Sequence, residues 1–341
     1  IEASPIPEEP MPKDSAKPVV GVDLGATKVL AGVVDSHYKI LATAKRATKG
    51  DQGVGAVVER ITKTVRDAVK EAGLSLTDIA GVCSAAPGAL NADEGVVRFA
   101  PNLEAWQNVP FAKLLSEQLT GVPVFIENDG NLGALGEVTL GVGQGVRNLV
   151  GIFVGTGIGG GIVLDGKLWR GTHLVAGEIG HMVILAEGPV CGCGRRGCLE
   201  SVASRTAIER DIRLGLRAGR ESMMGELIKH EGKDRITSGI VAEAYAKRDP
   251  LVYEVISRAQ HYLGIFCGSV INFLDPQMIV IGGGVAEALG EGFVDPVREI
   301  AYQYAMNRQD AQNVKIVLSE LGDHAVLIGA AVHARQRLGM K

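Results

Sequence analysis

The chain has 341 residues, enough for two domains of ordinary size or one large one. Hydrophobic residues make up 46% and charged residues 22%, so the chain can bury a core, and the net charge of −4 argues against nucleic-acid or membrane-surface binding as its main role. No apolar run is long enough to predict a transmembrane helix.

Residues 1–18 are rich in Pro, Glu and Lys and lack the apolar stretch of a signal peptide, so we expect a disordered, solvated tail. Met11 is a candidate natural start, which would leave residues 1–10 outside the native protein. Because no export signal is visible, we expect a cytoplasmic protein. In that reducing compartment, the crowding of three of the five cysteines between Cys191 and Cys198 favours metal ligation.

From Val19 onward, the pattern predicts an α/β chain of alternating strands and helices. In chain order, the expected elements are strand Val19–Asp23, strand Val29–Val34, helix Val54–Ala72, strand Ile79–Ser84, helix Phe111–Leu119, strand Val122–Ile126, helix Asn131–Leu140, strand Leu149–Val154, strand Gly161–Leu164, helix Ala203–Leu214, helix Pro250–Leu274, strand Met278–Ile281, helix Pro296–Met306, strand Val314–Leu318 and helix Ala325–Leu338. The helix before Asp275 is expected to be buried on most of its circumference, Phe273 included.

Two of these segments, Val19–Asp35 and Leu149–Asp165, align with each other without a gap. Gly21 falls on Gly151, and both segments are predicted to form a strand, a glycine turn and a second strand. The match suggests a duplicated architecture with a cleft between its halves. The alternative is that any two glycine-rich hairpins look alike.

The first glycine turn is a candidate phosphate site. Asp23 ends a strand and could hold Mg²⁺, while backbone N–H groups near Gly25 could bind phosphate oxygens. Thr27 and Lys28 would add a hydroxyl and a cation. A plain hairpin is the competing interpretation.

Two further glycine clusters fit the same use. The segment Gly155–Gly161 is expected to be a turn, in which Thr156, Gly157 and Gly159 could contact a nucleotide. The cluster Gly282-Gly283-Gly284 follows a strand and opens a helix, another place for a phosphate. Three such clusters in one chain favour a nucleotide held between two lobes.

The segment Glu127-Asn128-Asp129 comes directly after an apolar strand and before a helix. Ligands of open α/β sheets gather at the carboxyl ends of strands. Asp129 could therefore accept the proton of a hydroxyl nucleophile, as a kinase requires. The competing role is an N-cap for the following helix.

One imidazole and three thiols lie close together in the sequence: His181, Cys191, Cys193 and Cys198. They can complete a tetrahedral Zn²⁺ site with no open position, so the metal is expected to be structural. A disulfide fits poorly, because Cys191 and Cys193 are too close in sequence to bridge easily.

Several residues near this loop could bind hydroxyl groups. With one His181 nitrogen on zinc, the other is fixed in direction and can hydrogen-bond a ligand. Glu178 and Glu200 could accept from sugar hydroxyls, or could simply support the metal loop or be solvated. Asn102 could pair with vicinal hydroxyls, or form an Asx turn after Pro101.

Together these motifs resemble the ROK family of sugar kinases and repressors, within the actin/hexokinase superfamily, over nearly all of Val19–Leu338. The resemblance implies two α/β lobes of duplicated, actin/hexokinase-like (ribonuclease H-like) fold with a cleft between them. The first lobe would comprise residues 19–126 with the C-terminal helix 325–341, and the second residues 127–324 with the zinc loop 181–198.

The resemblance also implies site residues. Asp129 would be the base toward the 6-hydroxyl of a hexose, and zinc would be held by His181 and the three cysteines. The sugar would be bound by Gly88, Asn102, Asn128, Asp129, Glu178, His181 and Glu200. The nucleotide would be bound by Asp23, Gly25, Thr27, Lys28, Thr156, Gly157, Gly159, Gly282, Gly283 and Gly284.

The expected activity is therefore ATP- and Mg²⁺-dependent phosphorylation of a hexose, with glucose favoured by the Asn102–Trp106 loop. N-acetylmannosamine, fructose and allose stay open as substrates, polyphosphate as a donor, and a non-catalytic sugar sensor as another role. Repressors of the family carry a DNA-binding domain ahead of this body, and residues 1–18 are too short for one, so no nucleic-acid partner is expected. Relatives are often dimers or tetramers, which suggests a homo-oligomer.

Overall fold

The computed structural model describes residues 17–25, 27–100, 103, 106–231 and 236–340. Asn102 and residues 1–16 of the expected tail lie outside this set. Lys17 and Pro18, which were assigned to the tail, are instead attached to the folded body. Pro18 O accepts from Ala80 N at 2.9 Å, and Lys17 O accepts from Arg335 Nη1 at 3.3 Å.

The first sheet has five strands in the order β3-β2-β1-β4-β8. Its strands are β1 Val19–Leu24, β2 Lys28–Val34, β3 Ile40–Ala47, β4 Val82–Ala86 and β8 Val124–Asn128. The first three are antiparallel neighbours, whereas β1, β4 and β8 run parallel. The central strands are apolar and buried because helices cover both faces, with α1 (Gly53–Glu71) and α2 (Phe111–Gln118) on one of them.

The second sheet repeats this topology in the order β11-β10-β9-β12-β13. Its strands are β9 Leu149–Val154, β10 Ile158–Leu164, β11 Lys167–Leu168, β12 Met278–Gly282 and β13 Lys315–Leu318. The same order of antiparallel and parallel neighbours recurs, which favours duplication over a chance likeness of two hairpins.

The gap-free alignment of the two hairpins is wrong by one residue. In the first, Leu24 pairs with Val29, so four residues separate the paired ones in the sequence. In the second, Val154 pairs with Ile158 across three residues. Gly159, Gly160 and Gly161 therefore belong to β10, and the predicted turn Gly155–Gly161 is too long.

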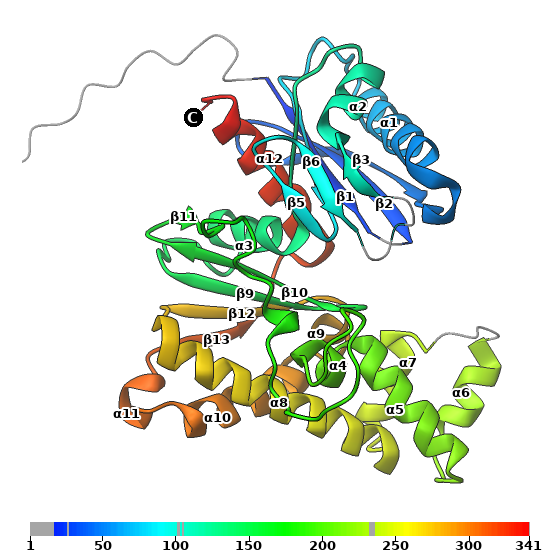
Figure 1. Ribbon diagram of the computed structural model, residues 1–341, viewed down its shortest axis with the longest axis vertical. Helices are drawn as coiled ribbons and strands as arrows, with labels where there is room; N and C mark the ends of the chain where they lie inside the picture. The colour runs from blue at the N-terminus through cyan, green and yellow to red at the C-terminus, as the bar shows by residue number, and fades with distance from the viewer. Residues whose placement is uncertain (1–16, 26, 101–102, 104–105, 232–235, 341) are drawn as a thin grey trace, which may run out of the picture.

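Two helices join the sheets. Helix α3 (Asp129–Thr139) follows the first sheet but packs on β9 and β10, whereas α12 (Ala325–Arg337) follows the second sheet and packs on β1 and β4. They cross each other at the centre of the molecule (Figure 1). The contact is so close that a Cβ on Gly329 would lie 1.8 Å from the carbonyl oxygen of Leu132. The lobe boundaries at residues 126 and 324 stay a prediction.

Further helices cover the far face of the second sheet (Figure 1). They are α4 Leu199–Ala203, α5 Arg205–Arg217, α6 Met224–Glu231, α7 Ser238–Ala246, α8 Pro250–Leu274, α9 Gly284–Leu289, α10 Glu291–Tyr304 and α11 Arg308–Ala311. The predicted start at Pro296 is wrong, because α10 begins at Glu291 and holds this proline within its length. Phe273, predicted to be buried, is 86% exposed on α8.

A small third sheet belongs to the loops between β4 and α2. It consists of β5 Ala89–Asn91, β6 Val96–Phe99 and β7 Gln107–Val109. Trp106 anchors these loops, since its ring is buried and meets Phe111 edge-on with centroids 5.0 Å apart. Among the described residues, no helix combines the length and apolar character needed to cross a membrane.

Candidate active site and metal centre

The end of β8 and the start of α3 carry the predicted catalytic segment. The Asn128 side chain caps α3, since its Oδ1 accepts from Gly130 N at 2.9 Å and Asn131 N at 3.2 Å. Asp129 is the first helical residue, and its Oδ1 accepts from Gly130 N at 2.9 Å. Capping and a role for Asp129 therefore do not compete, because the neighbouring amide caps the helix.

The surroundings of Asp129 leave its carboxylate accessible and raise its pKa. Solvent reaches its side chain, yet the surrounding protein desolvates the carboxylate and raises its pKa, while hydrogen bonds from backbone N–H groups lower it. A raised pKa brings a carboxylate closer to the working range of a general base.

Glu178, another predicted sugar ligand, lies within electrostatic reach of Asp129. Burial raises the pKa of Glu178; the nearby His181 lowers it, and the charges of Asp129 and Glu200 raise it further. These electrostatic couplings bring together acids from three separate segments of the chain. Gly88 lies in the short connection between β4 and β5, two residues after Ala86, which lies opposite Asn128 in the sheet.

Glu200, in α4, links the metal loop to the second glycine turn. Its Oε2 accepts from the backbone N of Ile158 at 3.0 Å, and its Oε1 lies 3.4 Å from Cys191 Sγ. A Cβ on Gly157 would come within 2.1 Å of the same carboxylate. The missing side chain at Gly157 therefore makes room for Glu200.

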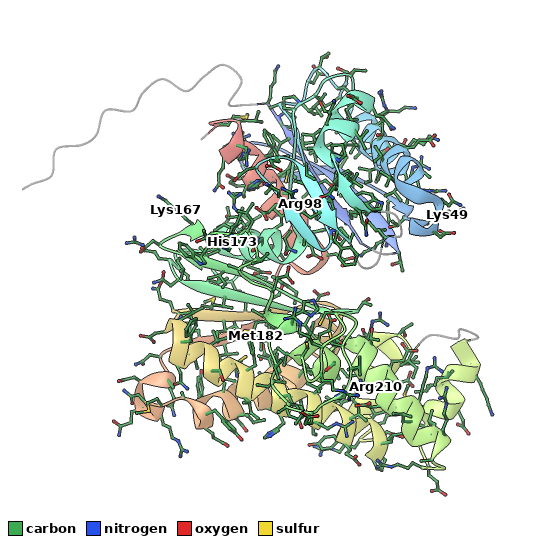
Figure 2. The ribbon with its side chains drawn as sticks, in the orientation of Figure 1. Lys49, Arg98, Lys167, His173, Met182 and Arg210 are labelled. Carbon is green, nitrogen blue, oxygen red and sulfur yellow. The ribbon has the colours of Figure 1, made fainter. Side chains whose placement is uncertain are left out.

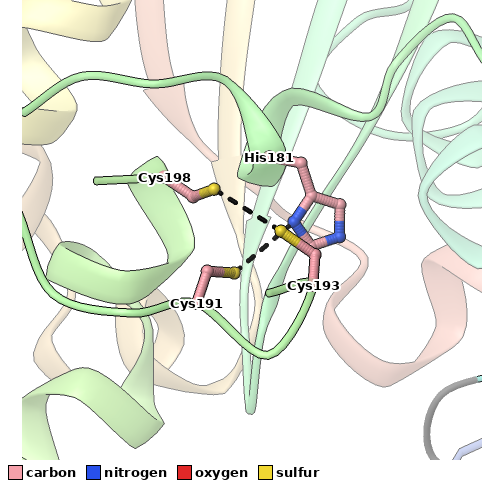
Figure 3. A group of neighbouring side chains, drawn as sticks. All are labelled: His181, Cys191, Cys193 and Cys198. Carbon is pink, nitrogen blue, oxygen red and sulfur yellow. Dashed lines mark hydrogen bonds between the residues drawn. The ribbon is translucent and has the colours of Figure 1, made fainter. Parts of the chain in front are cut away.

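The predicted metal ligands converge (Figure 3). The ligand atoms of His181, Cys191, Cys193 and Cys198 all lie within 4.8 Å of one another. Sγ of Cys193 is 3.7 Å from Sγ of Cys198, and Sγ of Cys191 is 3.7 Å from Nδ1 of His181. Tetrahedral zinc with Zn–S bonds of about 2.3 Å requires sulfur atoms roughly 3.7 Å apart, so the donor set fits this ion.

All five cysteines of the chain are free thiols, so no disulfide competes for this loop. A backbone N–H of Arg195 lowers the pKa of Cys193 to about 7, whereas burial raises that of Cys191 to about 12. The backbone N–H of Arg195 therefore favours the thiolate form of Cys193, the form in which cysteine binds a metal. In Figure 2, Met182 marks the start of this loop.

The first glycine turn brings charges together from both halves of the chain. Burial, followed by the charge of Asp129, raises the pKa of Asp23 to about 7. Lys28 Nζ lies 2.5 Å from Asp323 Oδ2, which precedes α12. Sequence reasoning missed Asp323. The available signal was the duplication, because Asp129 likewise stands at the start of the helix that follows a sheet.

The remaining predicted nucleotide ligands lie at two turns of the second sheet. The Thr156 hydroxyl accepts from Arg205 Nη2 at 2.7 Å, and Gly155 N donates to Gly157 O at 2.9 Å. The cluster Gly282–Gly284 connects β12 to α9 as predicted, with Gly283 at a φ of 84°. Thr27 is exposed beside the first turn.

Comparisons with known proteins find one family model and several relatives that span nearly the whole chain. The chain matches the model of the ROK family over residues 19–337. It is 35% identical to a glucokinase of Thermotoga maritima over 326 residues, which cover 94% of this chain and 98% of that protein. A ROK family glucokinase from Streptomyces griseus, solved with glucose and AMPPNP, matches with a TM-score of 0.83 at 34% identity, covering 94% of this chain and 99% of that one.

A xylose repressor of Caldicellulosiruptor bescii is also similar, at 32% identity over 91% of this chain and 76% of the repressor. The likeness to the solved glucokinase confirms the predicted two-lobed α/β fold.

Proposed function

Because the chain belongs to the ROK family, we propose that it is a hexose kinase, which transfers the γ-phosphate of ATP to the 6-hydroxyl of glucose. The observation that carries this proposal is the position of Asp129. Its carboxylate has a raised pKa, and its charge acts both on Glu178, the acid proposed for the sugar, and on Asp23, the acid proposed for Mg²⁺.

In the proposed reaction, Asp129 accepts the proton of the 6-hydroxyl as the sugar oxygen bonds to the γ-phosphorus. The bond between that phosphorus and the bridging oxygen of ADP breaks. Such transfer depends mainly on positioning and on stabilising the negative charge that develops. Lys28 and the backbone N–H groups of the glycine turns would supply that stabilisation, and Asp23 would hold Mg²⁺.

The sugar would be oriented by Gly88, Asn102, Asn128, Glu178, His181 and Glu200. The Asn128 cap supports this role, because its Oδ1 is committed to the helix and its amide N–H groups remain as donors for a hydroxyl oxygen. Zinc would be structural, held by His181 and the three cysteines, and would fix the imidazole in one orientation.

The test is ADP release over a panel of hexoses, first with ATP and then with polyphosphate. We expect glucose to give the highest kcat/KM with ATP, and N-acetylmannosamine, fructose and allose to give lower values. A different best sugar would replace glucose within the same mechanism. Absence of hexose-dependent ADP release would contradict the kinase assignment.

The similarity to xylose repressors supports a second candidate, a sugar sensor without turnover. Sugar binding measured by calorimetry, without ADP release, would favour the sensor. We further propose that the protein works in the cytoplasm, where ATP and free hexoses meet, as a homodimer or homotetramer. Light scattering of the purified chain tests the oligomeric state.

A further inference from the structure

Arg170 connects segments that are far apart in the sequence. It follows β11, in the segment that leads to Glu178 and that His173 marks in Figure 2. Its Nε lies 3.5 Å from Oε2 of Glu127 at the end of β8. Its Nη1 lies 3.4 Å from Oδ1 of Asp93, in the turn between β5 and β6. The arginine thus bridges the second sheet, the last strand of the first sheet and a turn of the third.

Glu127 accepts hydrogen bonds from residues on both sides of the proposed base. Its side chain is 1% exposed, and its Oε1 accepts from Asn128 N at 2.9 Å and from Asn131 Nδ2 at 3.0 Å. These two donors stand on either side of Asp129 in the chain. One carboxylate oxygen therefore holds both ends of the turn from which Asp129 projects.

Arg170 balances the negative charge at the other carboxylate oxygen of Glu127. Oε2 is buried and accepts no hydrogen bond within the described residues, and Arg170 is the ion-pair partner of this carboxylate there. A buried carboxylate that loses its cation is strongly disfavoured, so it takes up a proton or moves. Burial already raises the pKa of Glu127, and the charge of Arg170 opposes that rise.

The backbone of the same arginine shapes the loop toward the sugar side. Arg170 O accepts from Ala176 N at 3.1 Å, which closes the segment just before Glu178. A Cβ added to Gly177 would lie 3.5 Å from Oδ1 of Asn131, so the end of this loop passes close to the first turn of α3. The side chain and the backbone of Arg170 therefore connect the acid expected on the sugar to the turn that carries the base.

We propose that Arg170 is a positioning residue for phosphoryl transfer, which acts through Glu127 to fix the first turn of α3 and the carboxylate of Asp129. The inference rests on the proposed function. It predicts that an arginine with no contact to sugar or nucleotide controls kcat, because it decides whether Glu127 can hold both donors. Asp93 would tie this arrangement to the loops of the third sheet.

The test is a double-mutant cycle with Arg170→Met and Glu127→Gln, measured by ADP release with glucose and ATP. The amide of Glu127→Gln keeps the acceptor oxygen and needs no cation. We expect Arg170→Met alone to lower kcat at least about tenfold, with a smaller change in KM, since misplacing a reacting group is costly. In the Glu127→Gln background, the same substitution should change kcat by less than about twofold.

The pH profile separates positioning from general destabilisation. Glu127 faces Arg170 and Asp93, and Asp129 faces Asp23 and Glu178. In Arg170→Met the acid limb of kcat should move to higher pH, because Glu127 gains a proton more readily. In the double variant Arg170→Met/Glu127→Gln, the acid limb of the kcat profile should return to its wild-type pH. A simple loss of packing would not restore it.

Arg337→Met is the matched control, because Arg337 Nη1 lies 2.9 Å from the same Asp93 and pairs with no second acid among the described residues. We expect its kcat and acid limb to match the wild type. Equal effects of Arg170→Met in both backgrounds, or an Arg337→Met variant as impaired as Arg170→Met, would overturn the inference.

If Arg170→Met does not fold, Arg170→Lys is measured in its place. A lower kcat with an unchanged acid limb supports the proposal, because lysine keeps the charge without the guanidinium geometry. A wild-type kcat overturns it. If the wild-type enzyme shows no hexose-dependent ADP release, the proposed function is contradicted as well. If the wild type is active but the effects of Arg170→Met and Glu127→Gln on kcat are additive, only the role of Arg170 is contradicted.

Discussion

The pKa of Asp23 predicts how the stability of this protein depends on pH. Burial and the facing charges of Asp129 and Asp323 raise it from 3.8 to about 7, although Lys28 opposes them. Between these two pH values, the folded protein holds one proton more than the unfolded chain. The free energy of unfolding therefore falls as pH rises through this window. Asp23→Asn removes this titrating group and with it the part of the fall that Asp23 causes.

The size of the effect follows from the shift. A difference of about 3 pH units corresponds to about 4 kcal/mol, at roughly 1.4 kcal/mol per unit. Because water reaches part of the Asp23 side chain, this is an upper limit. We expect Asp23→Asn and the wild type to be equally stable near pH 4, and the variant to be more stable above pH 7.

The assay is urea unfolding at several pH values between 4 and 8, without Mg²⁺ or nucleotide. Asp165→Asn is the control, since Asp165 is 80% exposed and pairs with Arg147 at the surface. Its curve should parallel that of the wild type. If Asp23→Asn also parallels the wild type, the burial and charge argument for Asp23 is refuted.

Three further outcomes are expected. Asp129→Asn keeps the shape of the side chain, so kcat for ADP release should fall by about 10² to 10⁴ with little change in glucose affinity, and near-normal turnover would remove Asp129 as the base. Cys193→Ser should lose zinc by metal analysis, melt at a lower temperature and bind glucose more weakly, and a wild-type protein purified without zinc would contradict the coupling. Gly329→Ala places its Cβ 1.8 Å from a backbone oxygen of α3 and should cost about 1–3 kcal/mol or more of stability, whereas Gly239→Ala, with its nearest contact at 3.9 Å, should be neutral in the same melt.

Local patterns were enough to predict most of the framework. The apolar stripe Val57, Val58, Ile61, Val65 and Val69 is wholly buried in α1, as its spacing indicates. The ligand spacing of the cysteine loop likewise predicted a cluster that the structure assembles. In both cases neighbours in sequence supply the whole signal.

Contacts between distant segments could not be predicted in this way. Lys28 pairs with Asp323, which is 295 residues away in the sequence, and the Ser319 hydroxyl donates to the buried Glu137 at 2.5 Å although 182 residues separate the two. Arg170 is similar, because nothing near it in sequence identifies Glu127 as its partner. Such pairs depend on how α3 and α12 exchange between the sheets, which no local periodicity contains.

The glycine clusters were attributed to phosphate binding, but the structure divides them into two groups. A Cβ on Gly161 would lie 2.5 Å from Gly130 O, and one on Gly283 would lie 2.7 Å from the backbone of β9, so these glycines are needed for packing. A Cβ on Gly284 would come no closer than 3.7 Å to any described atom, and one on Gly159 would lie 3.9 Å from Gly130 Cα and 4.0 Å from Asp129 Oδ1, so both could be accommodated. A side chain at Gly159 would therefore approach the carboxylate that is proposed to act as the base. Lack of space explains the packing glycines without any ligand, whereas the free volume at Gly159 and Gly284 is what a bound nucleotide would use.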